Sequence, residues 1–134
     1  RGLLKAAKCG GAVLVACGLN AGAAAARALE FGDRVCILCC GQEGKPALED
    51  SICAGLLVER LLLLRPGLSL GKGARTVLEA WCRAGRKLEA AMRSPHARRL
   101  REIGFSEDLD FCCRVDVTGI VPRYDPSTGL ALDS

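Results

Sequence analysis

Two short apolar runs, separated by a helix-forming segment, constrain the fold of this chain more than any other feature. They are Ala12 to Cys17 (AVLVAC) and Arg34 to Cys40 (RVCILCC). Each has the length of a strand and lacks polar alternation, which is typical of a strand covered on both faces. The alanine-rich stretch 21–30 lies between them and closes at Gly32, a helix-ending signal. We therefore expect parallel strands joined by right-handed crossovers.

Helices and a hairpin are predicted around these strands from capping residues and turn residues. In the first half of the chain the predicted helices are Leu3 to Lys8, a helix that follows Asn20 and is capped by it, and Ala47 to about Leu64. In the second half we expect helix through much of 74–101, broken at Ser94-Pro95, with a shorter helix from His96 to Glu102. A further short helix is predicted to be capped at 106–108. The final segment predicts a β-hairpin with its turn at Asp125 to Gly129. The predicted fold is a layered α/β/α arrangement with a mainly parallel sheet and a C-terminal β-hairpin, in one α/β domain over residues 1–134.

The nine cysteines are interpreted as core residues and not as a disulfide framework. A framework needs a small, loop-rich secreted chain, whereas this chain has 134 residues and 50% hydrophobic content. Cys17, Cys36, Cys39 and Cys40 stand in apolar runs, where cysteine behaves as a small buried hydrophobe. The longest apolar run, 52–64, is interrupted by charge and too short to span a bilayer. We expect a cytoplasmic protein with no membrane segment.

Positive charge is concentrated in one helical stretch. The chain has a net charge of +4, and residues 74–101 alone hold eight basic and two acidic residues. Nucleic-acid binding is the general alternative for such a stretch. Aromatic residues that could stack on bases are nearly absent, so we expect no nucleic-acid partner.

The candidate chemistry lies in the loops that follow the two runs, because ligands of parallel sheets bind beyond the carboxyl ends of the strands. The first loop is Gly18-Leu19-Asn20. The second, Gly41 to Pro46, contains Gln42, Glu43 and Lys45 and precedes Glu49-Asp50. Paired carboxylates suit a hard cation such as Mg²⁺. The alternative is that acidic residues in a first helical turn only stabilise the helix dipole.

Three other interpretations have weaker support. Cys36-x-x-Cys39-Cys40 resembles half of a zinc motif, but only Cys112-Cys113 and His96 could complete it, so strand packing explains it better. The glycine-rich segments do not follow the spacing of nucleotide-binding loops. His96 stands where a loop meets a basic helix. Its alternative roles are a general acid, an anion ligand, and an ordinary surface histidine.

Several segments together resemble the 2-phosphosulfolactate phosphatase family. The most specific is 47–61, Ala-Leu-Glu-Asp-Ser-Ile-Cys-Ala-Gly-Leu-Leu-Val-Glu-Arg-Leu. Three others follow the family's order: Gly18-Leu19-Asn20-Ala21, the segment 94–100 (SPHARRL), and 108–116 (DLDFCCRVD) followed by Val121-Pro122. The resemblance covers nearly the whole chain.

This resemblance implies a magnesium-dependent hydrolase that removes phosphate from 2-phospho-3-sulfolactate, a small anionic phosphorylated sulfonate, on the way to coenzyme M or sulfolactate. Carried over by position, Glu49 and Asp50 become catalytic residues and Mg²⁺ ligands. The implied substrate contacts are Asn20, Gly41 and Lys45 for the phosphate, and His96, Arg98 and Arg99 for the sulfonate or carboxylate.

The resemblance also implies an incomplete enzyme. Family members carry an Asp-Val-Leu-Arg-Ala-Thr-Thr-like segment and a Thr-Asn-Gly-Thr-like segment, and neither occurs in these 134 residues. Arg1-Gly2 leads directly into a helical sequence, so we expect a fragment corresponding to the C-terminal portion of a larger phosphatase. Its activity would need the missing N-terminal half, and a homo-oligomer is a further expectation. The alternative is a noncatalytic fragment, or a binding or assembly module, that retains the fold.

Overall fold

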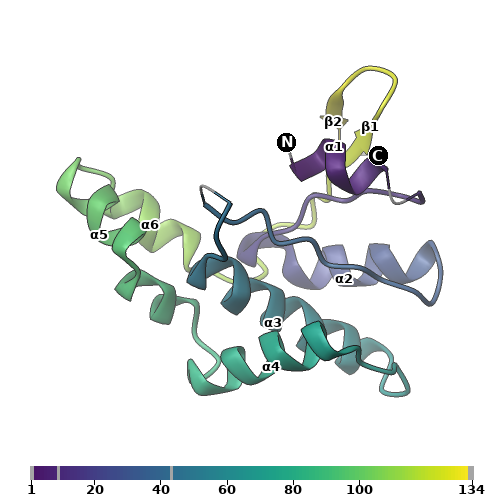
Figure 1. Cartoon of the computed structure of the whole chain (residues 1–134), viewed down its shortest axis with the longest axis horizontal. Helices are drawn as coiled ribbons and strands as arrows, with labels where there is room; N and C mark the ends of the chain where they lie inside the picture. The colour runs from purple at the N-terminus through teal and green to yellow at the C-terminus, as the bar shows by residue number, and fades with distance from the viewer. Residues whose placement is uncertain (1, 9, 43, 133–134) are drawn as a thin grey trace.

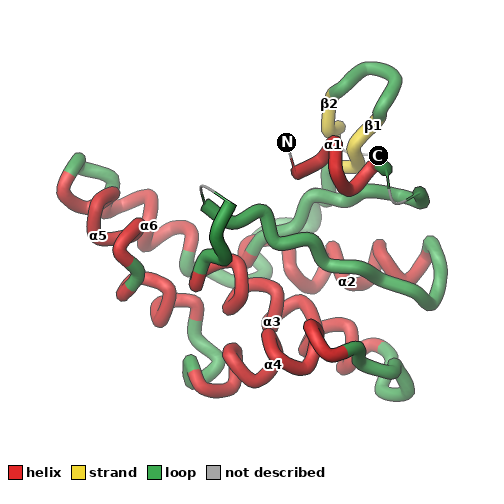
Figure 2. The backbone as a smooth tube through the Cα atoms, viewed as in Figure 1, coloured by secondary structure: helices red, strands yellow, loops and turns green. Residues whose placement is uncertain are grey.

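A computed structural model describes residues 2–8, 10–42 and 44–132 (Figure 1). Arg1, Cys9 and Glu43 lie outside the described residues. The structure is a mixture of helices and extended segments (Figure 2). Its elements are α1 (Gly2–Ala7), the 3₁₀ turn η1 (Gly18–Asn20), α2 (Ala21–Glu30), α3 (Leu48–Leu64), α4 (Lys72–Arg83), the 3₁₀ helix η2 (Leu88–Arg93), α5 (Pro95–Glu102), α6 (Ser106–Cys112), β1 (Arg123–Asp125) and β2 (Leu130–Leu132).

The core is built around α3, which packs against α2 on one side and α4 on the other (Figure 1). The second half of α3 carries apolar residues on most sides of the helix, whereas a surface helix carries them on one side only. Ile52 and Leu56 are the largest side chains in the protein that are fully buried. Trp81 of α4 is 3% exposed and belongs to the same hydrophobic cluster. A helix of this kind is stable only when neighbours cover it.

Gly55 sets the distance between α3 and α4. A Cβ at this position would lie 2.3 Å from the backbone oxygen of Val77 and 2.5 Å from the Cβ of Trp81. The absence of a side chain therefore lets the backbone of α4 approach α3 closely. At the other end of this contact, Glu59 accepts a hydrogen bond of 2.8 Å from Arg86. Partial burial acts to raise the pKa of Glu59, but hydrogen bonding and the nearby guanidinium charges outweigh it and lower that pKa.

The helix predictions are largely confirmed. Predicted helices at Leu3–Lys8, at 47–64 and after Ser106 correspond to α1, α3 and α6, and the break at Ser94-Pro95 separates η2 from α5. The basic stretch 74–101 is helical except around Gly85 and Arg86, which both adopt positive φ (+68° and +57°). These two residues turn the chain between α4 and η2.

The C-terminal hairpin is also confirmed. β1 and β2 are antiparallel, with Tyr124 opposite Ala131. The backbone nitrogen and hydroxyl of Ser127 both donate to Asp125 Oδ1, at 2.9 and 2.7 Å. These hydrogen bonds lower the pKa of Asp125 below its usual value. The carboxylate of Asp125 thus fixes the predicted turn.

The two apolar runs differ from the prediction of buried parallel strands. Both are extended, and in Figure 1 both run from right to left, the first above α2 and the second across the front of α2, but no hydrogen bond joins them within the described residues. Val13 and Val15 instead bond the segment around Arg123 in an antiparallel sense, with Tyr124 N to Val13 O at 2.9 Å and Val15 N to Pro122 O at 2.8 Å. The run Arg34 to Cys40 is largely exposed. The only sheet among the described residues is the hairpin, and a layered parallel sheet is not observed.

The prediction that the cysteines of these runs are buried is wrong. Cys17, Cys36, Cys39 and Cys40 are exposed free thiols. The physical reason is that α2 and α3 cover the runs on one side only, so the outward side chains have no second layer. Cys53 of α3, in contrast, is partly buried beside the core.

No helix in the described part of the chain is long and apolar enough to cross a membrane. This agrees with the interpretation of the interrupted run 52–64, which forms most of α3 and is largely buried within the protein.

Replacing Gly55 with alanine is expected to destabilise the protein by about 2 kcal/mol or more, because the new methyl group would force α3 and α4 apart. Gly73 of α4 is the matched control: nothing lies within 4 Å of its would-be Cβ. Gly73→Ala should raise stability slightly, by up to about 1 kcal/mol, through helix propensity. Urea unfolding of the two variants measures the difference, and a neutral Gly55→Ala would contradict the close approach.

Candidate functional site

The loop from Gly41 to Lys45 is held closed by its own backbone. Gln42 and Lys45 exchange two backbone hydrogen bonds, of 3.0 and 2.9 Å. Gly41 has a φ of +66°, and a Cβ there would lie 2.3 Å from the backbone oxygen of Lys45. Glycine is therefore the residue that fits this position without displacing the loop.

Asp50 ties this loop to the first turn of α3. Its Oδ2 accepts a hydrogen bond of 2.6 Å from the backbone nitrogen of Gly41. Glu49, in the same turn, is half-buried and makes no hydrogen bond or ion pair with any residue that the structure describes. Ala47 precedes the helix and supplies no side-chain cap. The first turn of α3 thus presents one free carboxylate together with backbone amides that remain available to an anion.

His96 brings a second helix start to the same loop. Its Nδ1 lies 3.2 Å from Nε2 of Gln42. Because an amide nitrogen donates, Nδ1 is the acceptor, and a neutral His96 ring carries its proton on Nε2. The first turn of α5 is fixed by Ser94, which is 3% exposed and accepts a hydrogen bond of 3.1 Å from Ala97 N. His96 is therefore held with a donor nitrogen facing away from Gln42.

Basic side chains surround this arrangement at the surface. Lys45 is exposed on the loop, and Arg98 and Arg99 are exposed on α5, just after His96. Neither arginine side chain contacts the loop among the described residues. They contribute positive charge near the start of α5, which favours anionic groups of a ligand.

The ends of both extended runs lie near the first half of α3. Burial raises the pKa of the Cys53 thiol to about 11, and the negative charges of Cys17, Asp50 and Cys39 add to this effect. Cys39 also donates a hydrogen bond of 3.7 Å to the backbone oxygen of Asp50. Cys17 and Cys39, at the ends of the two runs, are thus both close enough to act on the Cys53 thiol.

Asn20 is placed differently from the other candidates. It is 5% exposed, and its side chain bonds only backbone groups: it accepts from Cys17 N at 2.9 Å and donates to Val15 O at 3.1 Å and Ile120 O at 2.9 Å. It does not cap α2, contrary to prediction. Asn20 therefore joins the first extended run to the segment that precedes the hairpin.

The amino terminus of α2 is occupied by a side chain of this protein. Asp116, which has a φ of +55°, accepts a hydrogen bond of 2.6 Å from Gly22 N and one of 3.0 Å from Arg60 Nε. A carboxylate thus already satisfies the start of α2 that the first loop was predicted to offer to a substrate. The sequence analysis did not identify Asp116 as a structural residue. The one available signal was that aspartate often occurs in turns.

The donors at the loop suit Mg²⁺ only as an ion held through one or two protein carboxylates. No group of three or more His, Cys, Asp or Glu side chains arranged for a metal occurs within the described ranges. Mg²⁺ often binds proteins through one or two carboxylates, with water and substrate oxygens completing the octahedron. The free carboxylate of Glu49 and the second oxygen of Asp50 match that requirement.

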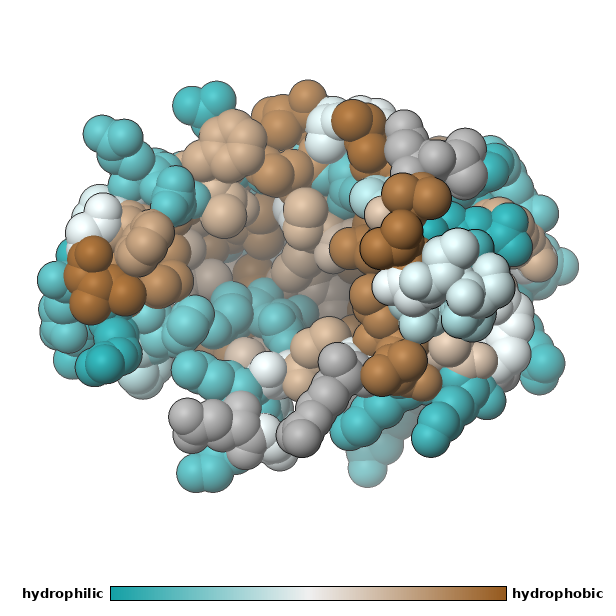
Figure 3. All heavy atoms as spheres, turned by 90° about the horizontal axis from the view of Figure 1, so that it is seen from above, coloured by the Kyte–Doolittle hydropathy of each residue, from teal (hydrophilic) through white to brown (hydrophobic). Residues whose placement is uncertain are grey.

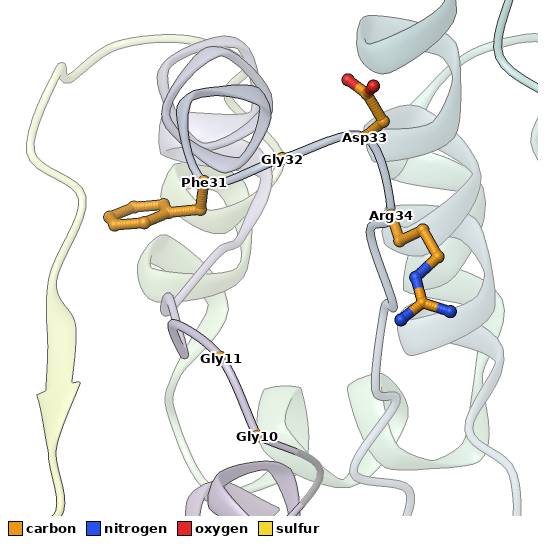
Figure 4. Close-up of a pocket in the computed structure, with 6 residues that line it drawn as sticks. All are labelled: Gly10, Gly11, Phe31, Gly32, Asp33 and Arg34. Carbon is orange, nitrogen blue, oxygen red and sulfur yellow. The ribbon is translucent and has the colours of Figure 1, made fainter.

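The structure therefore brings Gly41, Lys45, Glu49, Asp50 and His96 into one region, the loop and the two helix starts around it, which we call the loop site. Gln42, which links the loop to α5, was part of the predicted loop but was not a predicted site residue. A cavity lies away from the loop site, between Gly10-Gly11 and Phe31 to Arg34 (Figure 4).

Fold and site together define a mixed helix and sheet protein with a polar surface site that combines two carboxylates, a lysine and a histidine. Comparison with known proteins makes this specific. The model of the 2-phosphosulpholactate phosphatase family matches residues 1–127, and the chain belongs to this family.

Curated relatives support the same assignment. Each is named a probable 2-phosphosulfolactate phosphatase: one from Pseudothermotoga lettingae is 42% identical over 94 residues, covering 69% of this chain and 40% of the relative. One from Thermus thermophilus is 37% identical over 121 residues, covering 90% of this chain and 51% of the relative. One from Deinococcus radiodurans is 31% identical over 115 residues, covering 85% of this chain and 48% of the relative. The chain thus spans about half the length of these relatives.

Asn20→Ala is expected to lower the free energy of unfolding by about 2 kcal/mol, because it removes three hydrogen bonds made by a buried side chain. Gln42→Ala, which removes an exposed hydrogen bond, should change stability by less than about 0.5 kcal/mol. Thermal or urea unfolding of both variants tests the comparison. Equal, small effects would show that Asn20 is not a structural link.

Proposed function

We propose that this chain is part of a phosphatase that hydrolyses 2-phospho-3-sulfolactate to sulfolactate and phosphate. The observation that carries the proposal is the convergence of Asp50 and His96 on one loop, through Gly41 and Gln42, in a chain of the 2-phosphosulfolactate phosphatase family. The proposed substrate carries phosphate, sulfonate and carboxylate groups. Helix starts and guanidinium groups are the elements that such anions favour.

The proposed binding roles follow from position. Lys45 and the loop beginning at Gly41 are proposed to contact the phosphate, and His96, Arg98 and Arg99 the sulfonate or carboxylate. Supporting this, Lys45, Arg98 and Arg99 are exposed, and free to turn toward a ligand. For Asn20 the proposed contribution is indirect, since its hydrogen bonds hold the Gly18 turn in place.

Glu49 and Asp50 are the proposed Mg²⁺ ligands and catalytic residues. When bound, the ion would supply Lewis acidity toward a phosphoryl oxygen. Asp50, held by the Gly41 amide, would keep the loop and α3 at a fixed distance while substrate binds. His96, with its Nε2 proton directed away from Gln42, is placed to donate a hydrogen bond to an anionic substrate oxygen.

The finer statements about the whole enzyme are also proposals. A layered α/β/α fold with a mainly parallel sheet is proposed for the full-length enzyme, supported by the two extended runs that cross α2 in the same direction (Figure 1). A cytoplasmic location and a step in coenzyme M or sulfolactate formation are proposed from the family resemblance.

A second candidate is a noncatalytic binding or assembly module. It is favoured by the match to only about half of each relative's length and by the lack of a three-residue metal cluster among the described residues. The two candidates differ in whether the loop site hydrolyses phosphate once the rest of the phosphatase chain is present.

The 134-residue chain alone is expected to release little or no phosphate from 2-phospho-3-sulfolactate, with or without Mg²⁺. The reason is that Lys45 and His96 are exposed and Glu49 and Asp50 are only half-buried, so the described residues do not enclose the site. A malachite-green assay with Mg²⁺ and with EDTA measures this. Rapid release that depends on Mg²⁺ would show that these residues form a complete site.

Weak Mg²⁺ binding is expected to depend on both acidic residues of the first turn of α3. Titration calorimetry should show binding to the native chain that weakens at least about threefold in Glu49→Gln and in Asp50→Asn, because each removes one of the one or two carboxylates that such a site uses. Glu102→Gln, at the far end of α5, is the control and should bind as the native chain does. Identical titrations in all variants would leave helix stabilisation as the role of the pair.

A further inference from the structure

The segment Arg34 to Cys40 is extended but unpaired. No backbone nitrogen or oxygen of these seven residues makes a hydrogen bond to any part of the chain that the structure describes. The other extended run does have a partner, since Val13 and Val15 bond the region of β1. In Figure 2 the segment crosses in front of α2 as a long loop. Unpaired, extended backbone is a template for the addition of a strand.

Two apolar side chains of this segment are exposed, one on each face of the extended chain. Ile37 is directed toward the core and packs against it. Val35 and Leu38 are 38% and 48% exposed, although both are residues that normally seek burial. Seen from above, in Figure 3, the molecule shows apolar residues around a hollow in its surface. Backbone hydrogen bonds and apolar contacts are therefore both available to a partner along the same seven residues.

A cavity separates the beginnings of the two extended runs. It has a volume of about 400 Å³ and is lined by Gly10, Gly11 and the segment Phe31 to Arg34. Figure 4 shows the backbone of Gly10-Gly11 on one side and Arg34 on the other, with the Phe31 ring turned away from the space. Paired strands lie only about 4.8 Å apart, which leaves no such space between them. The cavity thus marks room beside Arg34 for additional chain.

The lengths of the relatives indicate what fills this room. The chain covers 40% of the Pseudothermotoga lettingae relative and 51% of the Thermus thermophilus relative. About half of each relative is therefore chain of the same protein that has no counterpart in these 134 residues. The contact of such a segment with the helical core would be intramolecular in the relatives, which raises its effective concentration.

We propose that Arg34 to Cys40 is a docking edge for a β-strand from the part of the phosphatase chain that these 134 residues do not match. The incoming strand is extended, pairs with the backbone of residues 34–40, and covers Val35 and Leu38 with apolar side chains. The proposal rests on family membership and on the exposed edge, and it is independent of the reaction proposed for the loop site.

The test uses the portion of the Thermus thermophilus relative that this chain does not match, expressed together with the 134-residue chain. A one-to-one complex is expected on affinity purification and size exclusion. Cys36 reports on the edge itself, because it is an exposed thiol in the middle of the proposed ladder. Its alkylation by iodoacetamide, followed by peptide mass spectrometry, should slow at least about tenfold in the complex. Cys82 of α4 is also exposed and should react equally in both states.

Leu38→Glu is expected to abolish the complex, because it places a charge on the face that becomes covered. Leu63→Glu is the matched control, since Leu63 is 68% exposed near the end of α3, away from the edge. Both variants should keep the helical circular dichroism of the native chain.

Three results would overturn the proposal. They are the absence of a complex with the native chain, a complex in which Cys36 stays fully reactive, and a dimer of the 134-residue chain alone in which Cys36 is protected. The last result would assign the edge to a second copy. Because no result depends on phosphate release, failure here is distinct from failure of the proposed reaction.

Discussion

The close contact between α3 and α4 at Gly55 is the constraint on which the rest of the structure depends. It allows a helix that is apolar on most sides to be buried between α2 and α4, with Ile52 and Leu56 fully enclosed. The two ends of α3 then make different contacts. The first turn carries Glu49 and Asp50 to the loop site, whereas Arg60, near the other end, bonds Asp116. Packing at one glycine thereby positions both the candidate chemistry and the chain that surrounds α2.

Polar groups in this protein fall into two sets according to whether the protein itself satisfies them. Asn20 and Asp116 bond backbone groups distant in the sequence, and Asp116 also bonds Arg60, so they maintain the fold. The first-turn amides of α3, the Glu49 carboxylate and Nε2 of His96 are left open at the surface. A ligand gains most from groups that have not already found a partner, because those need not give up a bond to bind it. This contrast is why the loop site, and not the start of α2, is the candidate for substrate.

Much of the helical structure and part of the site were predictable from sequence because their signals are local. Ser94-Pro95 predicted the start of α5, and the turn at Asp125 predicted the hairpin. The acidic pair and the loop before it were also recognised as one region. The contact of Gln42 with His96 and the burial of Asn20 could not be predicted, since each joins residues more than fifty positions apart. The apolar run 34–40 predicted a covered strand, but in the structure the run is extended and largely exposed. Apolar composition does not identify the chain that would cover a strand.

The central claim is that α3 is the stable centre of this chain and that residues 34–40 form an unpaired edge. Amide hydrogen exchange of the isolated 134-residue chain tests both parts in one experiment. The slowest amides should lie between Ile52 and Leu61, and those of residues 34–40 should exchange within about tenfold of the rate of an unstructured peptide. Protection of residues 34–40 equal to that of α3 would contradict the account, because it would mean that these 134 residues already contain the partner strand.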